Sequence, residues 1–260
     1  MRVVILCGGQ GARLREETEV RPKPMVEIGG RPMLWHIMKL YAHYGLSDFV
    51  LCLGYKGYVI KEFFMNYEAR TTDFTIRLGT NSSIEYHNAH PEEGWAVTLA
   101  ETGESALTGA RARRVRDYLE PGTFCLTYGD GLGDIQLDRL LRFHRAHGKI
   151  GTVTAVRPPG RFGEMRVNAD QVTSFAEKPQ VSEGFINGGF FVFEREFVER
   201  YLEDRDDLIL EREPLQRLAA DGELMAWPHE GFWQPMDTYR ELKLLQELWN
   251  SGSAPWKVWE

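Results

Sequence analysis

Cysteine is scarce in this chain. Cys7, Cys52 and Cys125 are the three cysteines among 260 residues, and each lies far from the others within an apolar run. No C-x-x-C pair exists, which argues against a zinc site and against a disulfide framework. We therefore expect buried free thiols in a reducing, cytoplasmic compartment.

An excess of positive charge is also missing. The sequence has 31 Lys and Arg against 38 Asp and Glu, which gives a net charge of −7 and a pI of about 5.6. Nucleic-acid-binding faces are usually basic, so we expect no nucleic acid as a partner. A small anionic substrate is compatible with this charge, because it needs only a local positive pocket.

Long hydrophobic runs are absent as well. No apolar stretch approaches the length of a membrane span, and no basic segment precedes an apolar run near residue 1. We therefore expect no membrane association. The seven histidines form neither a metal-ligand pattern nor a Ser/His/Asp or Cys/His arrangement, so nothing indicates a covalent nucleophile.

The pattern of apolar residues predicts the fold class. Strand-like and helix-like runs alternate through the first half, which predicts a mainly parallel, mixed sheet with helices on both faces. We expect one Rossmann-like, three-layer α/β domain over residues 1–260, with a small antiparallel β insertion at about residues 72–102. The expected strands outside the insertion include Val3–Cys7, Phe49–Leu53, Thr123–Tyr128 and Thr152–Val156, and the expected helices are Pro32–His43, Tyr58–Tyr67, Leu137–His147 and Asp237–Trp249. Within the insertion, we expect antiparallel strands at Phe74–Leu78, Ile84–His87 and Trp95–Leu99.

The first expected strand ends in a glycine-rich loop. Gly8-Gly9-Gln10-Gly11 follows it directly, and Arg13 comes two residues later. Glycines let backbone N–H groups approach an anion without a Cβ in the way, and arginine offers a fork of donors to phosphate. Neither G-x-G-x-x-G nor G-x-x-x-x-G-K-[ST] is present. The loop predicts a phosphorylated ligand, in particular a nucleotide, with an ordinary strand-to-loop turn as the alternative.

Three further charged side chains stand in loops that suit phosphate chemistry. Lys23 lies between Pro22 and Pro24, which stiffen its backbone, and a solvated lysine in a Pro-rich loop is the alternative to a phosphate ligand. Asp130 follows an apolar strand, at the sheet edge where open α/β sheets bind ligands, although a tight turn is the commoner role of an Asp-Gly dipeptide. Asp237 precedes a predicted helix, where an N-cap is the alternative to a metal ligand. Mg²⁺ is usually held by one or two carboxylates together with substrate phosphate oxygens.

Two tripeptides suit a sugar phosphate. Glu177-Lys178-Pro179 and Asn187-Gly188-Gly189 combine a carboxylate, an amide and an ammonium group. The first two groups are good partners for sugar hydroxyls, and the third is a partner for phosphate. Trp233 could cover a sugar ring, although core packing is the commoner role of one tryptophan.

In this order, the motifs resemble those of the sugar-nucleotide pyrophosphorylases. The shared motifs are Gly8–Leu14, Lys23-Pro24, Gly129–Gly131, Glu177–Pro179, Asn187–Gly189 and Asp237. Longer runs, such as Arg21–Gly30 and Gly231–Thr238, are similar to the glucose-1-phosphate cytidylyltransferase branch. The resemblance covers nearly the whole chain.

The resemblance implies a reaction and a set of site residues. An oxygen of the phosphate of α-D-glucose 1-phosphate attacks the α-phosphorus of CTP, and CDP-glucose and pyrophosphate result. It implies catalytic roles for Arg13, Lys23 and Asp130, and a Mg²⁺ held by Asp130 and Asp237. The implied nucleotide-binding residues are Leu6, Cys7, Gly8, Gly9, Gln10, Gly11, Ala12, Arg13, Lys23, Thr108, Gly109, Arg111 and Gly129. The implied sugar-phosphate residues are Glu177, Lys178, Asn187, Gly188 and Trp233.

Some alternatives and departures remain open. Ala12 stands where the family has Thr or Ser, so one hydroxyl contact to phosphate is lost or replaced by backbone. UTP or another hexose 1-phosphate could be the substrate, and a non-catalytic nucleotide-sensing homologue is a second reading. A nicotinamide oxidoreductase is disfavoured by the missing third glycine. The resemblance also implies a homo-oligomer, in particular a hexamer, and a product used in deoxysugar or O-antigen biosynthesis.

Overall fold

The computed structural model describes most of the chain. It leaves out Asn81, Ala89, Pro91, Glu93 and residues 159–163, 169–170 and 177–183, together with the side chains of Ala12, Arg15, 164–168 and 172–176. No helix in the described part has the length and apolarity of a bilayer-spanning segment.

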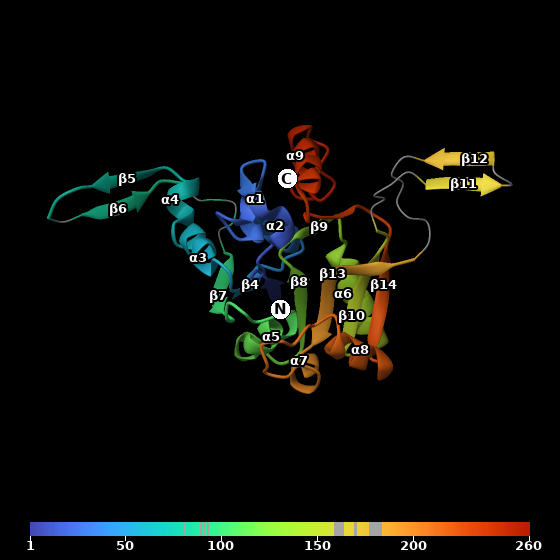
Figure 1. The fold of residues 1–260 in the computed structure, drawn as a ribbon. Coiled ribbons are helices and arrows are strands. Elements are labelled where there is room, and N and C mark those ends of the chain that lie inside the picture. The colour runs from blue at the N-terminus through green and yellow to red at the C-terminus, as the bar shows by residue number, and fades with distance from the viewer. Residues whose placement is uncertain are drawn as a thin grey trace.

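A seven-stranded sheet forms the middle of the molecule (Figure 1). In spatial order its strands are β14 (Leu224–His229), β10 (Gly151–Val156), β13 (Ile186–Glu194), β8 (Thr123–Tyr128), β1 (Arg2–Leu6), β4 (Asp48–Leu53) and β7 (Ala96–Glu101). β13 runs antiparallel to β10 and β8. The β1–β4, β1–β8, β4–β7 and β10–β14 pairs are parallel. The prediction of a mixed, mainly parallel sheet is confirmed.

Helices cover both faces of this sheet. One buried cluster includes side chains of α2 (Met33–His43), α3 (Gly57–Met65), α6 (Leu137–His147) and α9 (Tyr239–Asn250). The other includes side chains of α5 (Thr108–Arg114), α7 (Glu196–Arg200) and α8 (Glu213–Ala220). Along β1, Val3 and Ile5 belong to the first cluster and Val4 and Leu6 to the second. A strand buried on both faces explains why this run is apolar without alternation.

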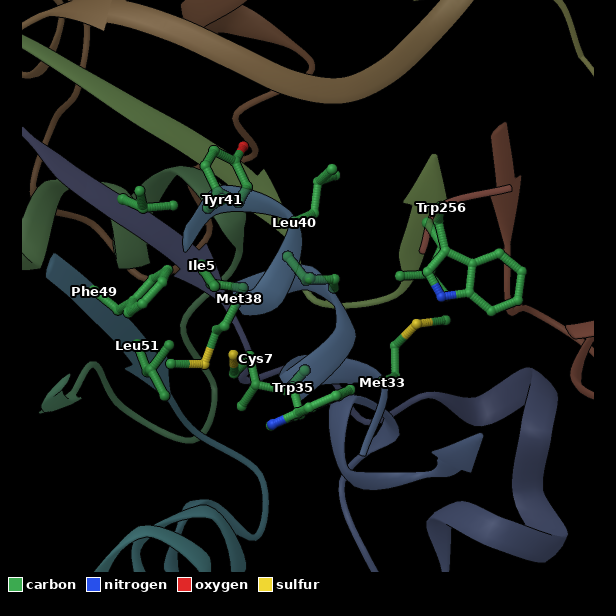
Figure 2. Packing of buried hydrophobic residues seen from close by; sticks show 14 of the residues in the cluster. Ile5, Cys7, Met33, Trp35, Met38, Leu40, Tyr41, Phe49, Leu51 and Trp256 are labelled. Carbon is green, nitrogen blue, oxygen red and sulfur yellow. The ribbon is translucent and has the colours of Figure 1, made fainter. Parts of the chain in front are cut away.

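The packing of α2 on the sheet shows how the first layer is held. Figure 2 shows Met38 and Tyr41 of α2 close to Ile5 of β1 and Phe49 of β4, all at most 1% exposed. Each such side chain contributes about 1.5–3 kcal/mol when it is fully buried. The layer therefore anchors β1, and with it the loop that follows β1.

Short elements complete the fold. They are α1 (Arg15–Thr18), α4 (Tyr67–Thr71), η1 (Ala12–Leu14), η2 (Lys23–Met25), η3 (Arg116–Tyr118), β2 (Glu27–Ile28), β3 (Arg31–Pro32), β5 (Phe74–Arg77), β6 (Ser83–Tyr86), β9 (Gly131–Gly133), β11 (Glu164–Asn168), β12 (Gln171–Ala176) and β15 (Trp233–Pro235). The expected helix Tyr58–Tyr67 is divided at Asn66 into α3 and α4.

One expectation for the β insertion was wrong. β5 and β6 form the antiparallel hairpin as expected, and Figure 1 shows this hairpin projecting beyond the sheet. The run Trp95–Leu99 was expected to belong with them, but β7 pairs in parallel with β4 at the edge of the central sheet. An edge strand is only partly covered, so its apolar residues alternate much as they do in a hairpin strand.

Candidate active site

The glycine loop and Asp130 lie at the carboxyl ends of neighbouring parallel strands. The loop follows β1 and Asp130 follows β8, and the two strands are paired side by side. Beside them is a cavity of about 320 Å³. The predicted nucleotide-binding residues that line it are Leu6, Cys7, Gly8, Gly9, Gly11, Arg13, Lys23, Thr108, Arg111 and Gly129. Gln10 and Gly109 are not among the lining residues, and the side chain of Ala12 lies outside the described set.

Lys23 points into this cavity from a stiff backbone. Pro22 precedes it with φ −68° and ψ 150°, and η2 begins at Lys23. Pro24 packs so closely on Gly129 that a Cβ there would come within 2.8 Å of its Cγ. Lys23 Nζ donates to Oδ2 of Asp130 and to Oδ1 of Asp237, both at 2.7 Å. Two carboxylates from distant parts of the chain therefore converge on one ammonium group.

A short antiparallel ladder brings these two carboxylates together. β15 pairs with β9, with Trp233 opposite Gly133 and Pro235 opposite Gly131. The backbone N–H of Met236 then donates to the carbonyl of Asp130 at 2.8 Å. Asp130 comes directly before β9 and Asp237 comes shortly after β15, so their separation is set by backbone hydrogen bonds.

Asp237 does not cap the helix that follows it. Thr238 is the N-cap of α9, and it forms a capping box with Glu241. The N–H of Asp237 donates to Glu241 Oε2 at 2.6 Å. Because Thr238 satisfies the helix end, the Asp237 carboxylate is directed to Lys23 and Arg13 instead. The N-cap alternative for Asp237 was wrong.

The charged groups around Lys23 favour its protonated form. Burial opposes the charge on Lys23, but the Asp130 and Asp237 carboxylates outweigh it and raise the pKa of Lys23 above its ordinary value. Arg13 adds a second cation, with Nη1 2.9 Å from Asp237 Oδ2, on a side chain that is 71% exposed. A charged lysine and an exposed arginine thus face the cavity beside two carboxylates.

Arg111 is held mainly by backbone carbonyls. Its buried guanidinium donates to the carbonyls of Leu53, Gly103 and Gly8 at 2.8–3.0 Å. A Cβ on Gly8 would overlap this guanidinium. A side chain at Gly8 would therefore have to displace this hydrogen-bonded guanidinium, independently of any ligand. Arg111 lines the cavity as predicted, and a contact with a nucleotide base stays a prediction.

Gly9 differs from Gly8 in this respect. A Cβ on Gly9 would meet no atom within 4 Å, and its φ is not among the positive values of the chain. The folded protein alone therefore gives no reason for glycine at this position. A ligand that approaches the backbone here supplies such a reason.

The sugar side of the predicted site is described in part. Glu177 and Lys178 lie outside the described residues. Asn187 Nδ2 donates to the Tyr128 hydroxyl at 3.0 Å, and Trp233 Nε1 donates to the carbonyl of Gly188 at 2.8 Å. Trp233 Nε1 would also lie 3.8 Å from a Cβ on Gly131, which is the residue that follows Asp130. Asn187 is thus linked to the cavity by its hydrogen bond to Tyr128, which lines it. Trp233 holds Gly188 and lies close to Gly131, beside Asp130.

The donor set of Asp130 and Asp237 fits a hard divalent cation. One oxygen of each carboxylate is 2.7 Å from the same Lys23 Nζ, so both already face a common point. No group of three or more His, Cys, Asp or Glu suited to a metal occurs among the residues described. A cation held here would therefore complete its coordination with water and substrate phosphate, as Mg²⁺ commonly does.

Tyr128 and Glu211 connect Asn187 with Thr108, and neither was predicted as a site residue. Tyr128 stands directly before the Gly129–Gly131 motif, whereas no local motif marks Glu211. The capping box at Thr238 and Glu241, in contrast, has the sequence signature T-x-x-E and could have been found.

Comparison with known proteins shows the family to which the chain belongs. The family model described as nucleotidyl transferase matches residues 2–234. A glucose-1-phosphate cytidylyltransferase of Salmonella typhimurium is 52% identical over 261 residues, with all of both chains covered. A probable glucose-1-phosphate cytidylyltransferase of Bacillus subtilis is 44% identical, again over both full lengths. A solved structure from Bacillus anthracis, assigned as a glucose-1-phosphate thymidylyltransferase, shares the fold at a TM-score of 0.69 and 16% identity, covering 95% of this chain and 94% of that one. The chain therefore belongs to the nucleotidyl transferase family, in the branch of the glucose-1-phosphate cytidylyltransferases.

Proposed function

We propose that this chain transfers CMP from CTP to α-D-glucose 1-phosphate. The observation that carries the proposal is the convergence of Asp130 and Asp237 on Lys23 beside the glycine loop. The full-length similarity to glucose-1-phosphate cytidylyltransferases supports the choice of substrates.

The reaction is a single in-line displacement. A phosphate oxygen of glucose 1-phosphate forms a bond to the α-phosphorus of CTP, while the bond from that phosphorus to the bridging oxygen of the β-phosphate breaks. The electron pair leaves with pyrophosphate. Such a transfer depends on positioning and on neutralising charge more than on covalent catalysis.

Different residues of the cavity bind the triphosphate, neutralise its charge and orient the sugar. The backbone at Gly8, Gly9 and Gly11 and the guanidinium of Arg13 bind the triphosphate and the leaving pyrophosphate. Lys23, kept protonated by its neighbours, neutralises charge at the α-phosphate. Asn187, with Glu177 beyond the described part, orients the sugar hydroxyls, and Lys178 binds the sugar phosphate.

Asp130 and Asp237 hold Mg²⁺ in this proposal. When bound, the ion withdraws charge from the phosphate oxygens that it contacts. The two carboxylates contribute the protein's part of its coordination, and their relative position is set by the β9–β15 ladder.

One assay tests the substrate assignment. Pyrophosphate release by the purified chain is measured with each of four nucleoside triphosphates against several hexose 1-phosphates. CTP with glucose 1-phosphate is expected to be the best pair. A higher kcat/KM with UTP, or with another hexose 1-phosphate, overturns the substrates while leaving the reaction type intact. No release with any pair, although nucleotide still binds, would favour a nucleotide-sensing homologue.

The setting of the activity is part of the same proposal. Residues 1–260 act as one nucleotidyltransferase domain in the cytoplasm, and three buried free cysteines support a reducing compartment. The product enters deoxysugar or O-antigen-type biosynthesis.

The chain also works as a homo-oligomer, with a hexamer as the expected form. The β5–β6 hairpin supports self-association, because Ile76, Leu78 and Ile84 on it are 48%, 90% and 56% exposed. A two-stranded hairpin with apolar residues in water is marginally stable alone, so a second copy is a suitable cover.

A further inference from the structure

Glu211 joins the two halves of the candidate site. It is half-buried in the loop between α7 and α8. Its Oε2 accepts a hydrogen bond from the Thr108 hydroxyl at 2.7 Å, and its Oε1 accepts one from the Tyr128 hydroxyl at 2.5 Å. Thr108 belongs to α5 and Tyr128 to β8, so hydroxyl groups from two separate elements hold this carboxylate.

Thr108 connects Glu211 to the nucleotide side of the site. It is the first residue of α5 and lines the cavity. Its Oγ1 donates to Glu211 and accepts from the N–H of Leu210 at 2.9 Å. A hydroxyl that donates to one fixed partner and accepts from another has a single orientation. Glu211 and Leu210 therefore set how Thr108 faces the cavity.

Tyr128 and Asn187 connect Glu211 to the sugar side of the site. A carboxylate can only accept, so the Tyr128 hydroxyl must give its proton to Glu211 and offer its lone pair to Asn187. Asn187 Nδ2 donates to that lone pair at 3.0 Å, while its Oδ1 accepts from the N–H of Gly189 at 2.9 Å. The amide is thus oriented at both ends, with one N–H and one lone pair left for sugar hydroxyls.

We propose that Glu211 is a positioning residue of the transfer reaction, which orients Thr108 beside the nucleotide and, through Tyr128, Asn187 beside the sugar. The inference rests on the proposed function, in which Asn187 contacts the sugar. Glu211 touches neither substrate and acts through the three side chains. A glutamine cannot replace it, because its amide presents N–H donors to one of two hydroxyls that already donate.

The kinetics of three single variants and one double variant test the coupling. Glu211→Gln is expected to raise the KM for glucose 1-phosphate about ten-fold, the equivalent of one charge-assisted hydrogen bond. Tyr128→Phe is expected to produce a similar rise by itself, and little further rise when it is added to Glu211→Gln. Asp206→Asn is the matched control. Asp206 lies in the same loop and binds Ser105 and Arg114 near the same helix, but it is outside the Asn187–Tyr128–Glu211–Thr108 chain.

Either of two kinetic results overturns the proposal. One is full additivity of Tyr128→Phe and Glu211→Gln, which means that the two side chains act separately. The other is a KM rise in Asp206→Asn equal to that in Glu211→Gln, which means that the loop serves only the fold of α5.

Crystal structures of the unliganded variants give a readout that needs no activity. In Glu211→Gln the Tyr128 hydroxyl and the Asn187 amide are expected to move apart, and in Asp206→Asn they are expected to stay together. An unchanged Asn187–Tyr128 contact in Glu211→Gln overturns the proposal. A wild-type chain that forms no CDP-glucose overturns the proposed function instead, and these structures still decide the positioning role.

Discussion

The Nζ atom of Lys23 lies 2.7 Å from Oδ1 of Asp237, although 214 positions separate the two residues in the chain. Asp130 Oδ2 is at the same distance from Nζ. A divalent cation held by Asp130 and Asp237 would therefore compete with the Lys23 ammonium group for the same two carboxylates.

Replacing Lys23 by methionine should expose this competition. Without the ammonium group the two carboxylates repel each other, so Lys23→Met should lower the free energy of unfolding by about 2 kcal/mol. This value is reduced from that of a fully buried pair because the Asp130 side chain is 37% exposed. Mg²⁺ should restore much of the loss. Urea denaturation with and without Mg²⁺ measures both effects.

Lys61→Met is the control for that comparison. Lys61 pairs with Glu101 at the surface, with 37% and 59% of the two side chains exposed, so its loss should cost under about 1 kcal/mol and should not depend on Mg²⁺. A Lys23→Met chain as stable as the wild type in the absence of Mg²⁺ would mean that Lys23 does not offset the repulsion between Asp130 and Asp237.

Two adjacent glycines offer a matched pair of alanine variants. Gly8→Ala should destabilise the fold by about 1–3 kcal/mol, because the new Cβ overlaps the Arg111 guanidinium. Gly9→Ala should leave the free energy of unfolding unchanged within about 0.5 kcal/mol but raise the KM for CTP about ten-fold or more, because a Cβ intrudes on the triphosphate. Urea denaturation and steady-state kinetics separate the two. An unaltered KM for CTP in Gly9→Ala would remove the loop from the triphosphate site.

The fold was predictable where the pattern of apolar residues is local. The helix Leu137–His147 begins and ends as expected, because its apolar face repeats at helical spacing and Gly148 ends it in the left-handed region. β7 was assigned to the wrong sheet, since an alternating run does not show which strand it pairs with. Its partner, β4, is chosen by tertiary packing.

The site was predictable to the extent that its residues stand in motifs. Lys23, Asp130 and Asp237 were found singly, but their convergence depends on the pairing of β9 with β15, which no local signal shows. Glu211 has no motif at all. It was missed because its partners, Thr108 and Tyr128, lie 103 and 83 positions away.

Acid should destabilise the protein through His36. Burial lowers the pKa of His36 to about 4, whereas an unfolded histidine titrates near 6.5. The unfolded chain therefore gains a proton first as the pH falls from about 6.5 to 4, and stability is lost across this window, by up to about 3 kcal/mol. Denaturation midpoints measured across these pH values show the slope.

His36→Gln isolates that contribution. Gln can keep a donor toward the carbonyl of Ile28, which His36 Nε2 contacts at 2.9 Å, but it does not titrate. The difference in stability between this variant and the wild type should shrink as the pH falls toward 4. A difference that stays constant with pH would mean that His36 is not the group responsible.

The β5–β6 hairpin should control self-association. Leu78→Glu combined with Ile84→Glu places charge on its most exposed apolar positions, so the mass measured by light scattering should fall toward that of one chain. Leu244→Glu on α9, also exposed, serves as the control and should leave the mass unchanged. An oligomer that survives the hairpin substitutions would place the interface elsewhere.

In the proposed function, Asp130, Lys23 and Asp237 form the catalytic centre of a nucleotidyl transfer. The most direct test is the rate of CDP-glucose formation by Asp130→Asn, compared with Asp138→Asn on the surface of α6, where Asp138 pairs with Arg142. The amide oxygen introduced by Asp130→Asn can still accept a hydrogen bond from Lys23, so the fold should persist. We expect a loss of at least about a thousand-fold in kcat for Asp130→Asn and wild-type turnover for Asp138→Asn. Unchanged pyrophosphate release by Asp130→Asn would contradict it.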